Sequence, residues 1–235
     1  MENYKFKKEK LLNNYMIKSV LTAASLHENV PPDWYYRSIR QNLFQRCWHK
    51  RRFEEVGKLI ERTSGQILDI GCADGTFTNV ILSKSRADKI IGIDVLKSSI
   101  NWASKHWSNK KRVTFRLGDA HNLKFKNDSF DAVFALEVLE HVFEPVVVLK
   151  EIYRILKTNG YAIFLVPSES MLFRIVWFFW GFYRGKIWKD THVHAYRNDY
   201  LLKLCRQVGF NLEVNKKFIL GMLQVVKVRK AYTNS

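Results

Sequence analysis

Cysteine is scarce in this 235-residue chain, which carries only Cys47, Cys72 and Cys205. An odd number of cysteines without a C-x-x-C pair does not support a disulfide framework, so we expect no disulfide partner and a reducing, cytoplasmic location. The first residues contain no uninterrupted apolar stretch, so we expect no signal peptide. A hydrophobic content of 47% with 26% charged residues excludes a disordered chain, a collagen and a polytopic membrane protein.

Acidic residues are also few, with 22 against 39 lysines and arginines, which gives a formal net charge of +17. A field of that sign attracts polyanions such as RNA, an anionic membrane surface or phosphorylated metabolites. The basic residues are spread along the chain, which fits solubility charge equally well. Both RNA and a peripheral position at a membrane surface therefore stay open as interpretations.

Repeats and low-complexity segments are absent, and the length favours one domain. Residues 1–64 are predicted to form an N-terminal helical extension. Apolar residues recur at helical spacing from about Ser38 to Arg62, and Gly65 follows the end of that helix.

Short apolar runs alternate with amphipathic stretches after Gly65, which predicts parallel strands joined by crossover helices on both faces of a sheet. The expected strands are 66–70, 89–93, 112–117, 131–136 and 161–166, and the expected helices are 76–84, 97–107, 145–156 and 198–208. The last two runs, Phe210–Phe218 and Met222–Val228, are separated by only three residues, which favours an antiparallel pair. The predicted fold is a doubly wound, mostly parallel α/β sheet with a terminal antiparallel hairpin.

Small residues follow the first strand, where Asp69, Gly71, Ala73 and Gly75 lead into a helix. Ligands of doubly wound sheets bind at the carboxyl ends of such strands. A dinucleotide fingerprint requires G-x-G-x-x-G, and Ala73 and Thr76 depart from that pattern.

Carboxylates also end the next two strands. Asp94 is suited to accept hydrogen bonds from both hydroxyls of an adenosine ribose. Asp119 and Ala120 follow the third strand, where an acid suits the exocyclic amine of adenine. Three acids at successive strand ends predict a nucleoside site.

These motifs resemble those of the class I S-adenosylmethionine (SAM)-dependent methyltransferases over roughly residues 65–228. The resemblance implies a seven-stranded sheet, SAM as cofactor and a methyltransferase domain over residues 65–230 with an aromatic insertion at 168–196. The cofactor-binding residues that it implies are Asp69, Gly71, Ala73, Gly75, Asp94, Val95, Asp119, Ala120, Leu136 and Glu137.

The segment from Ala135 to Val142 resembles the motif after the fourth strand in the ubiquinone-biosynthesis O-methyltransferases. In some of those enzymes, and in small-RNA 3′-terminal 2′-O-methyltransferases, the equivalent residues bind a divalent metal, which implies Glu137, Glu140 and His141 as ligands. Spacings of three and four place these side chains on one face of a helical turn. The alternative is a pocket shaped by the same residues without metal.

Two further histidines, His192 and His194, follow the fifth strand, and each is a candidate general base beside His141 or an extra metal ligand. The aromatic and cationic stretch before them fits a lid helix, a lipophilic channel or membrane-surface patch, or a nucleic-acid stacking surface. In the extension, Arg52 and His49 are candidates to pair with the methionine carboxylate of SAM.

The sequence therefore predicts methyl transfer from SAM to an oxygen of a small or lipophilic acceptor. An RNA methyltransferase and a non-catalytic SAM-binding protein are the alternatives.

Overall fold

The computed structural model of the chain describes residues 27, 29–168, 193–197 and 199–231. Most of the predicted aromatic insertion and most of residues 1–28 lie outside this part. In chain order the elements are α2 (Trp34–Gln41), α3 (Leu43–Gly57), β1 (Gln66–Ile70), α4 (Thr76–Lys84), β2 (Lys89–Asp94), α5 (Lys97–His106), β3 (Val113–Leu117), β4 (Phe130–Leu136), η1 (Leu139–His141), α6 (Pro145–Ile155), β5 (Leu156–Pro167), α8 (Tyr200–Val208), β6 (Phe210–Phe218) and β7 (Leu223–Lys230).

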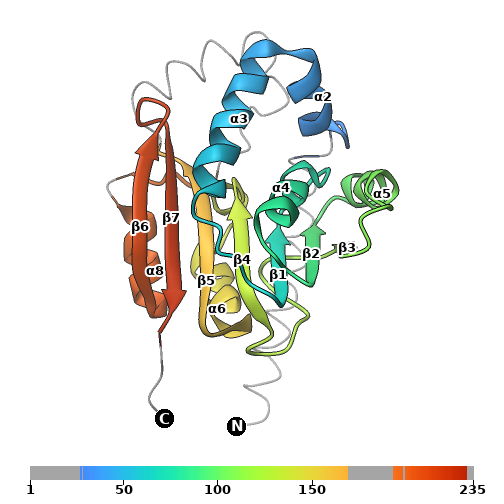
Figure 1. Cartoon of the computed structure of the whole chain (residues 1–235). Coiled ribbons are helices and arrows are strands. Elements are labelled where there is room, and N and C mark those ends of the chain that lie inside the picture. The colour runs from blue at the N-terminus through green and yellow to red at the C-terminus, as the bar shows by residue number, and fades with distance from the viewer. Residues whose placement is uncertain (1–26, 28, 169–192, 198, 232–235) are drawn as a thin grey trace, which may run out of the picture.

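One seven-stranded sheet has the order β3-β2-β1-β4-β5-β7-β6 (Figure 1). Strands β1 to β5 pair in parallel, whereas β7 is antiparallel to both β5 and β6. Because β1, β2 and β4 are parallel, their carboxyl ends lie at the same edge of the sheet. The strand order reverses direction between β1 and β4. The predicted doubly wound sheet with its terminal antiparallel hairpin is confirmed.

Alternating residues of the central strands pack into two separate cores, one on each face of the sheet. On β1, Leu68 and Ile70 join the core formed with α6 and α8. The intervening Ile67 joins the other core, to which α3 contributes Val56 and α4 contributes Ile81. Both faces are apolar because helices cover both, as expected for a parallel sheet.

The single helix predicted from Ser38 to Arg62 was wrong in its extent. The structure has two helices there, α2 and α3, and α3 already ends at Gly57. Asn42 is extended (φ −133°), and its side chain accepts the N–H of Gln45 at 3.0 Å, which caps α3. The apolar spacing continues across this corner, so periodicity alone does not detect the break.

Asp69, on β1, is buried and joins that strand to α4. Its Oδ2 accepts a hydrogen bond of 2.6 Å from the Thr78 hydroxyl. Burial raises the pKa of Asp69 to about 7, although the Thr78 hydrogen bond acts in the opposite direction. This carboxyl therefore binds a proton more tightly in the folded chain than in the unfolded chain.

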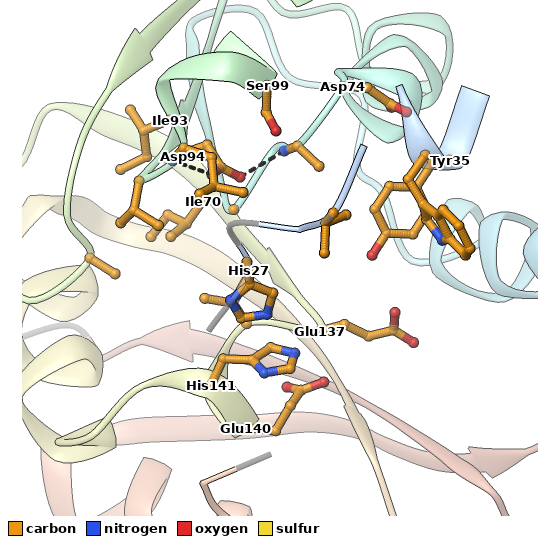
Figure 2. A pocket seen from close by; sticks show the side chains of 18 of the residues that line it. His27, Tyr35, Ile70, Asp74, Ile93, Asp94, Ser99, Glu137, Glu140 and His141 are labelled. Carbon is orange, nitrogen blue, oxygen red and sulfur yellow. Dashed lines mark hydrogen bonds between the residues drawn. The ribbon is translucent and has the colours of Figure 1, made fainter. Parts of the chain in front are cut away.

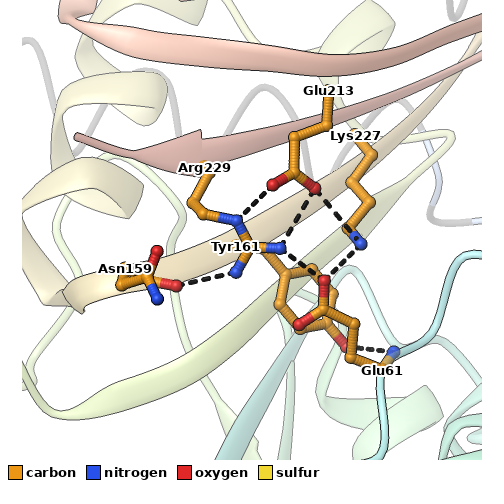
Figure 3. Close-up of polar contacts among 6 residues, drawn as sticks. All are labelled: Glu61, Asn159, Tyr161, Glu213, Lys227 and Arg229. Carbon is orange, nitrogen blue, oxygen red and sulfur yellow. Dashed lines mark hydrogen bonds and ion pairs between the residues drawn. The ribbon is translucent and has the colours of Figure 1, made fainter.

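A polar cluster fastens the segment between α3 and β1 to the hairpin (Figure 3). Glu61 pairs with Lys227 at 2.5 Å and also with Arg229, and Glu213 of β6 pairs with the same two cations. The Glu61 N–H donates to the Tyr161 hydroxyl at 3.0 Å. These contacts join chain segments that are far apart in the sequence.

Across the described ranges, we find no helix with the length and apolar character needed to cross a bilayer.

Tyr161→Phe should lower the free energy of unfolding by about 1 kcal/mol, because the variant removes the acceptor of the Glu61 N–H. Urea denaturation measures the change. Tyr153, whose ring packs against Phe210, offers a matched control, and Tyr153→Phe should have a smaller effect. Equal effects of the two variants would contradict the assigned role of the Tyr161 hydroxyl.

Asp69→Asn should change how stability depends on pH. The pKa of Asp69 rises from 3.8 to about 7 on folding, so its stabilising contribution is complete below pH 3.8 and is lost as the pH rises through 7. The asparagine variant does not titrate, so the wild type should lose stability relative to the variant across that window. Denaturation at several pH values measures this difference, and a constant difference would refute the assignment.

Candidate active site

A cavity of about 220 Å³ lies at the carboxyl ends of β1, β2 and β4. Residues of α2 and α3, including Trp34, Phe44 and Trp48, form its other wall. The N-terminal extension therefore contributes directly to the site, and its aromatic side chains make that wall apolar.

The turn after β1 contains three left-handed positions, at every second residue. They are Gly71 (φ +66°), Ala73 (φ +45°) and Gly75 (φ +73°). At Gly71 a Cβ would lie only 2.4 Å from Cγ2 of Val138, so this position has no room for a side chain. The left-handed conformation of Ala73 costs on the order of 1 kcal/mol. The Ala73 N–H donates to Oδ2 of Asp94 at 2.9 Å, which holds the turn in this conformation.

Asp94 and Val95 line the cavity at the end of β2 (Figure 2). The second carboxylate oxygen of Asp94 accepts the N–H of Leu96 at 2.8 Å. Burial raises the pKa of Asp94, and the two backbone N–H groups act against that shift. Each carboxylate oxygen has two lone pairs, so Asp94 retains acceptor capacity for the hydroxyls of a ribose.

Asp119 and Ala120 line the same cavity after β3. Oδ1 of Asp119 accepts the N–H of His121 at 3.0 Å and lies 2.9 Å from Nδ1 of the same residue. His121, which the sequence analysis did not identify, therefore orients the carboxylate of Asp119.

Asp69, Gly75 and Leu136, three of the residues predicted to bind the cofactor, lie outside the lining of this cavity. Asp69 and Leu136 instead line a smaller space behind the β1 turn. A Cβ at Gly75 would lie 2.6 Å from the ring of Phe115, so close packing is the constraint at this position. Asp69 and Leu136 therefore lie on the side of the turn that faces away from the cavity, and Gly75 allows the turn to pack closely.

Glu137 forms an ion pair with Arg52 of α3, with 2.5 Å between Oε2 and Nη2. Arg52 also donates from Nη1 to Nδ1 of His49 at 2.8 Å. Burial, with a smaller contribution from Arg52, lowers the pKa of His49 well below its usual value. The imidazole is therefore neutral, with its proton on Nε2.

Asp74 and Tyr35 are site residues that the sequence analysis missed. Oδ2 of Asp74 accepts the N–H of Tyr36 at 2.8 Å, which attaches α2 to the β1 turn. Burial raises the pKa of the Tyr35 phenol, and the charge of Glu137 adds to that effect. Asp74 stands within the glycine-rich motif and could have been found there, whereas no local pattern marks Tyr35.

His141 lines the cavity, and its ring meets the ring of His27 edge to face, with 4.6 Å between centroids. Figure 2 shows His141 and Glu140 on the opposite side of the cavity from Asp94 and Ser99, with His27 between them. His27 was not predicted, because it is an isolated histidine in the extension. The imidazole of His141 therefore shares one cavity with the Asp94 turn.

The predicted metal set of Glu137, Glu140 and His141 does not come together on one helical face. Only Glu140 and His141 belong to the 3-10 turn η1, whereas Glu137 precedes it with φ +56° and pairs with Arg52. Among the residues that the structure describes, no group of three or more potential ligands is arranged around a metal position. The left-handed backbone at Glu137 is the physical reason, because the predicted spacing assumed a continuous helix.

His194 lies outside the cavity lining, and its Nε2 is 3.1 Å from the carbonyl oxygen of Phe143. The structure thus places His194 beside the cavity lining and not in it, and its role as a general base stays a prediction. His192 lies outside the described residues.

The residues of the cavity fit SAM in two respects. Asp94 and Asp119 present carboxylates suited to its ribose and adenine. Nε of Arg52 and Nε2 of His49 are buried and have no hydrogen-bond partner among the described residues, which suits the binding of a carboxylate such as that of methionine.

Residues 68–164 match the family model described as a methyltransferase domain. The chain is 29% identical over 138 residues to a demethylmenaquinone methyltransferase of Symbiobacterium thermophilum, covering 57% of this chain and 55% of that protein. It is 26% identical over 151 residues to a malonyl-[acyl-carrier protein] O-methyltransferase of a Marinomonas species, covering 62% and 53%. The chain thus spans about half the length of these curated relatives.

Solved structures share the fold at low sequence identity. An S-adenosylmethionine-dependent methyltransferase from Mesorhizobium loti has a TM-score of 0.60 and 16% identity, covering 74% of this chain and 96% of that one. The [4+2]-cyclase SpnF has a TM-score of 0.64 and 17% identity, covering 77% and 80%. The chain therefore has the fold of the class I SAM-dependent methyltransferases, and its residues 68–164 are similar to a methyltransferase domain.

Proposed function

We propose that this protein transfers the methyl group of SAM to an oxygen of a small or lipophilic acceptor. The observation that carries the proposal is one cavity lined both by the strand-end residues Asp94 and Asp119 and by the imidazole of His141. The apolar side chains of Trp34, Phe44 and Trp48 favour a lipophilic acceptor.

When bound, SAM supplies an electrophilic methyl group on a positively charged sulfur. Asp94 and Asp119 orient the nucleoside, and Arg52 with His49 binds the carboxylate. His141 would accept the proton of an acceptor hydroxyl held beside it, and the methyl group would pass from the sulfur of SAM to that oxygen with S-adenosylhomocysteine as the leaving group. The wall formed by α2 and α3 excludes water from the reacting atoms.

Turnover must be measured directly, because the fold alone does not determine the reaction. SpnF, a [4+2]-cyclase by its title, shares this fold. Calorimetric titration with SAM should give saturable binding, and hydroxylated lipophilic acceptors should then yield S-adenosylhomocysteine. Absence of SAM binding would refute the proposal, and binding without turnover on any acceptor would favour a non-catalytic protein.

A salt series distinguishes a small acceptor from RNA. Binding to RNA weakens steeply as salt rises, because each phosphate contact releases counterions. Turnover on a small uncharged acceptor should change little over the same range. A steep loss of turnover with total RNA as acceptor would favour the RNA alternative.

Asp94→Ala should weaken SAM affinity by at least roughly 100-fold, since each hydrogen bond to a charged group contributes roughly 1.5–3 kcal/mol and two hydroxyls lose their acceptor. Calorimetry measures the affinity. Asp88, exposed at the opposite end of β2, provides the control Asp88→Ala, which should bind SAM normally.

Because Asp94 also holds the β1 turn, Asp94→Asn serves as a second variant that keeps one oxygen acceptor. Its affinity should lie between those of the wild type and the alanine variant. A folded Asp94→Ala protein with unchanged SAM affinity would overturn the site assignment.

His141→Ala should lower kcat by about 10²- to 10⁴-fold, the usual range for loss of a general base. SAM affinity should change little, because His141 lies across the cavity from Asp94 (Figure 2). Rates of S-adenosylhomocysteine formation measure the effect. His194→Ala is the matched comparison and should retain turnover. If His194→Ala lost turnover and His141→Ala retained it, His194 would be the general base in place of His141.

A further inference from the structure

Two adjacent apolar side chains are exposed at the corner between α2 and α3. Leu43 is 72% exposed and Phe44 is 61% exposed, directly after Asn42. Other exposed large apolar residues of the described chain, such as Leu220 and Leu117, stand singly in the sequence. Two such neighbours on a helix terminus are unfavourable in water and indicate a contact surface.

Cations flank these two side chains in the sequence, and no acidic residue occurs between Asp33 and Glu54. Arg40, Arg46 and Lys50 are all exposed. Arg46 donates to the backbone carbonyls of Ile39 and Arg40, and the Arg40 guanidinium lies over the ring of Tyr36, so these contacts leave both charges unneutralised. Within the part of the chain that the structure describes, Lys50 forms a long ion pair of 3.8 Å with Glu54.

The same corner reaches the cavity, because Phe44 is both exposed and part of its lining. Figure 1 shows the α2–α3 corner projecting at the end of the molecule toward which β1, β2 and β4 point. A flat partner that contacts Leu43 and Phe44 would therefore lie beside the cavity.

We propose that the α2–α3 corner, with Leu43, Phe44, Arg40, Arg46 and Lys50, docks on the surface of an anionic lipid bilayer. Apolar side chains that enter the boundary between head groups and acyl chains, flanked by cations that meet the phosphates, are the two components of interfacial binding. Charge complementarity identifies the bilayer as anionic.

An exposed leucine favours the bilayer over RNA, because RNA binding draws on cations and aromatic stacking and gains little from an aliphatic side chain. A docked corner would bring the mouth of the cavity to the bilayer, from which a lipophilic acceptor would enter. This last consequence rests on the proposed function, whereas the docking itself does not.

Sedimentation with vesicles tests the docking. The full chain should bind vesicles of phosphatidylcholine mixed with phosphatidylglycerol, and should not bind vesicles of phosphatidylcholine alone. Leu43→Ser and Phe44→Ser should each weaken binding to the anionic vesicles by roughly 10-fold, because each removes a buried apolar contact. Leu212→Ser, at an apolar residue 38% exposed on β6, is the matched control and should bind as the wild type does.

The double variant Arg40→Glu with Lys50→Glu should weaken binding by at least about 10-fold, since it replaces two cations that attract the anionic surface by two anions that it repels. Lys124→Glu with Lys126→Glu makes the same change in net charge in the loop between β3 and β4 and should have a much smaller effect. Equal losses in the two double variants would show that net charge alone drives binding, and would overturn the proposal.

Two further results would also overturn it. The first is absence of wild-type binding to anionic vesicles. The second is binding to total RNA that Arg40→Glu with Lys50→Glu abolishes while the vesicles stay unbound, which would identify an RNA surface. SAM calorimetry without lipid separates the proposals: SAM binding without vesicle binding removes only the docking, and the reverse removes only the proposed function.

Discussion

The carboxylate of Asp94 joins the two strands on which the candidate site is built. It ends β2 and accepts the N–H of Ala73 in the turn after β1, while its other oxygen accepts the N–H of Leu96. The β1 turn has a left-handed residue that is not glycine, and this hydrogen bond offsets its conformational cost. The residue best suited to bind a ribose is thus also the one that fixes the shape of the surrounding backbone.

The second wall of the cavity depends on contacts between the N-terminal helices and the sheet. Arg52 pairs with Glu137 at the end of β4, and the N–H of Tyr36 donates to Asp74 in the β1 turn. Both contacts lie at the edge of the cavity, so the helices enclose it without filling it. A cofactor carboxylate that binds beside Arg52 would therefore act directly on α3, the helix that carries Arg52 and forms part of the wall.

The parallel arrangement of β1 to β5 gives the molecule a functional end. The turns that follow β1, β2 and β4 open there, and the α2–α3 corner projects at the same end (Figure 1). The site and the exposed Leu43 and Phe44 are consequently neighbours in space. A lipophilic acceptor and a membrane surface are compatible with one another for this geometric reason.

The sequence by itself determined the alternation of strands and helices, the terminal hairpin, the glycine-rich turn and the acids Asp94 and Asp119, because short apolar runs and tight turns are local properties of the chain. Only the tertiary structure decided that Glu137 turns toward Arg52 and away from a metal set, and that His27 meets His141. Those outcomes depend on how α3 and the extension pack on the sheet, and residues so far apart in the sequence carry no periodic signal of their contact.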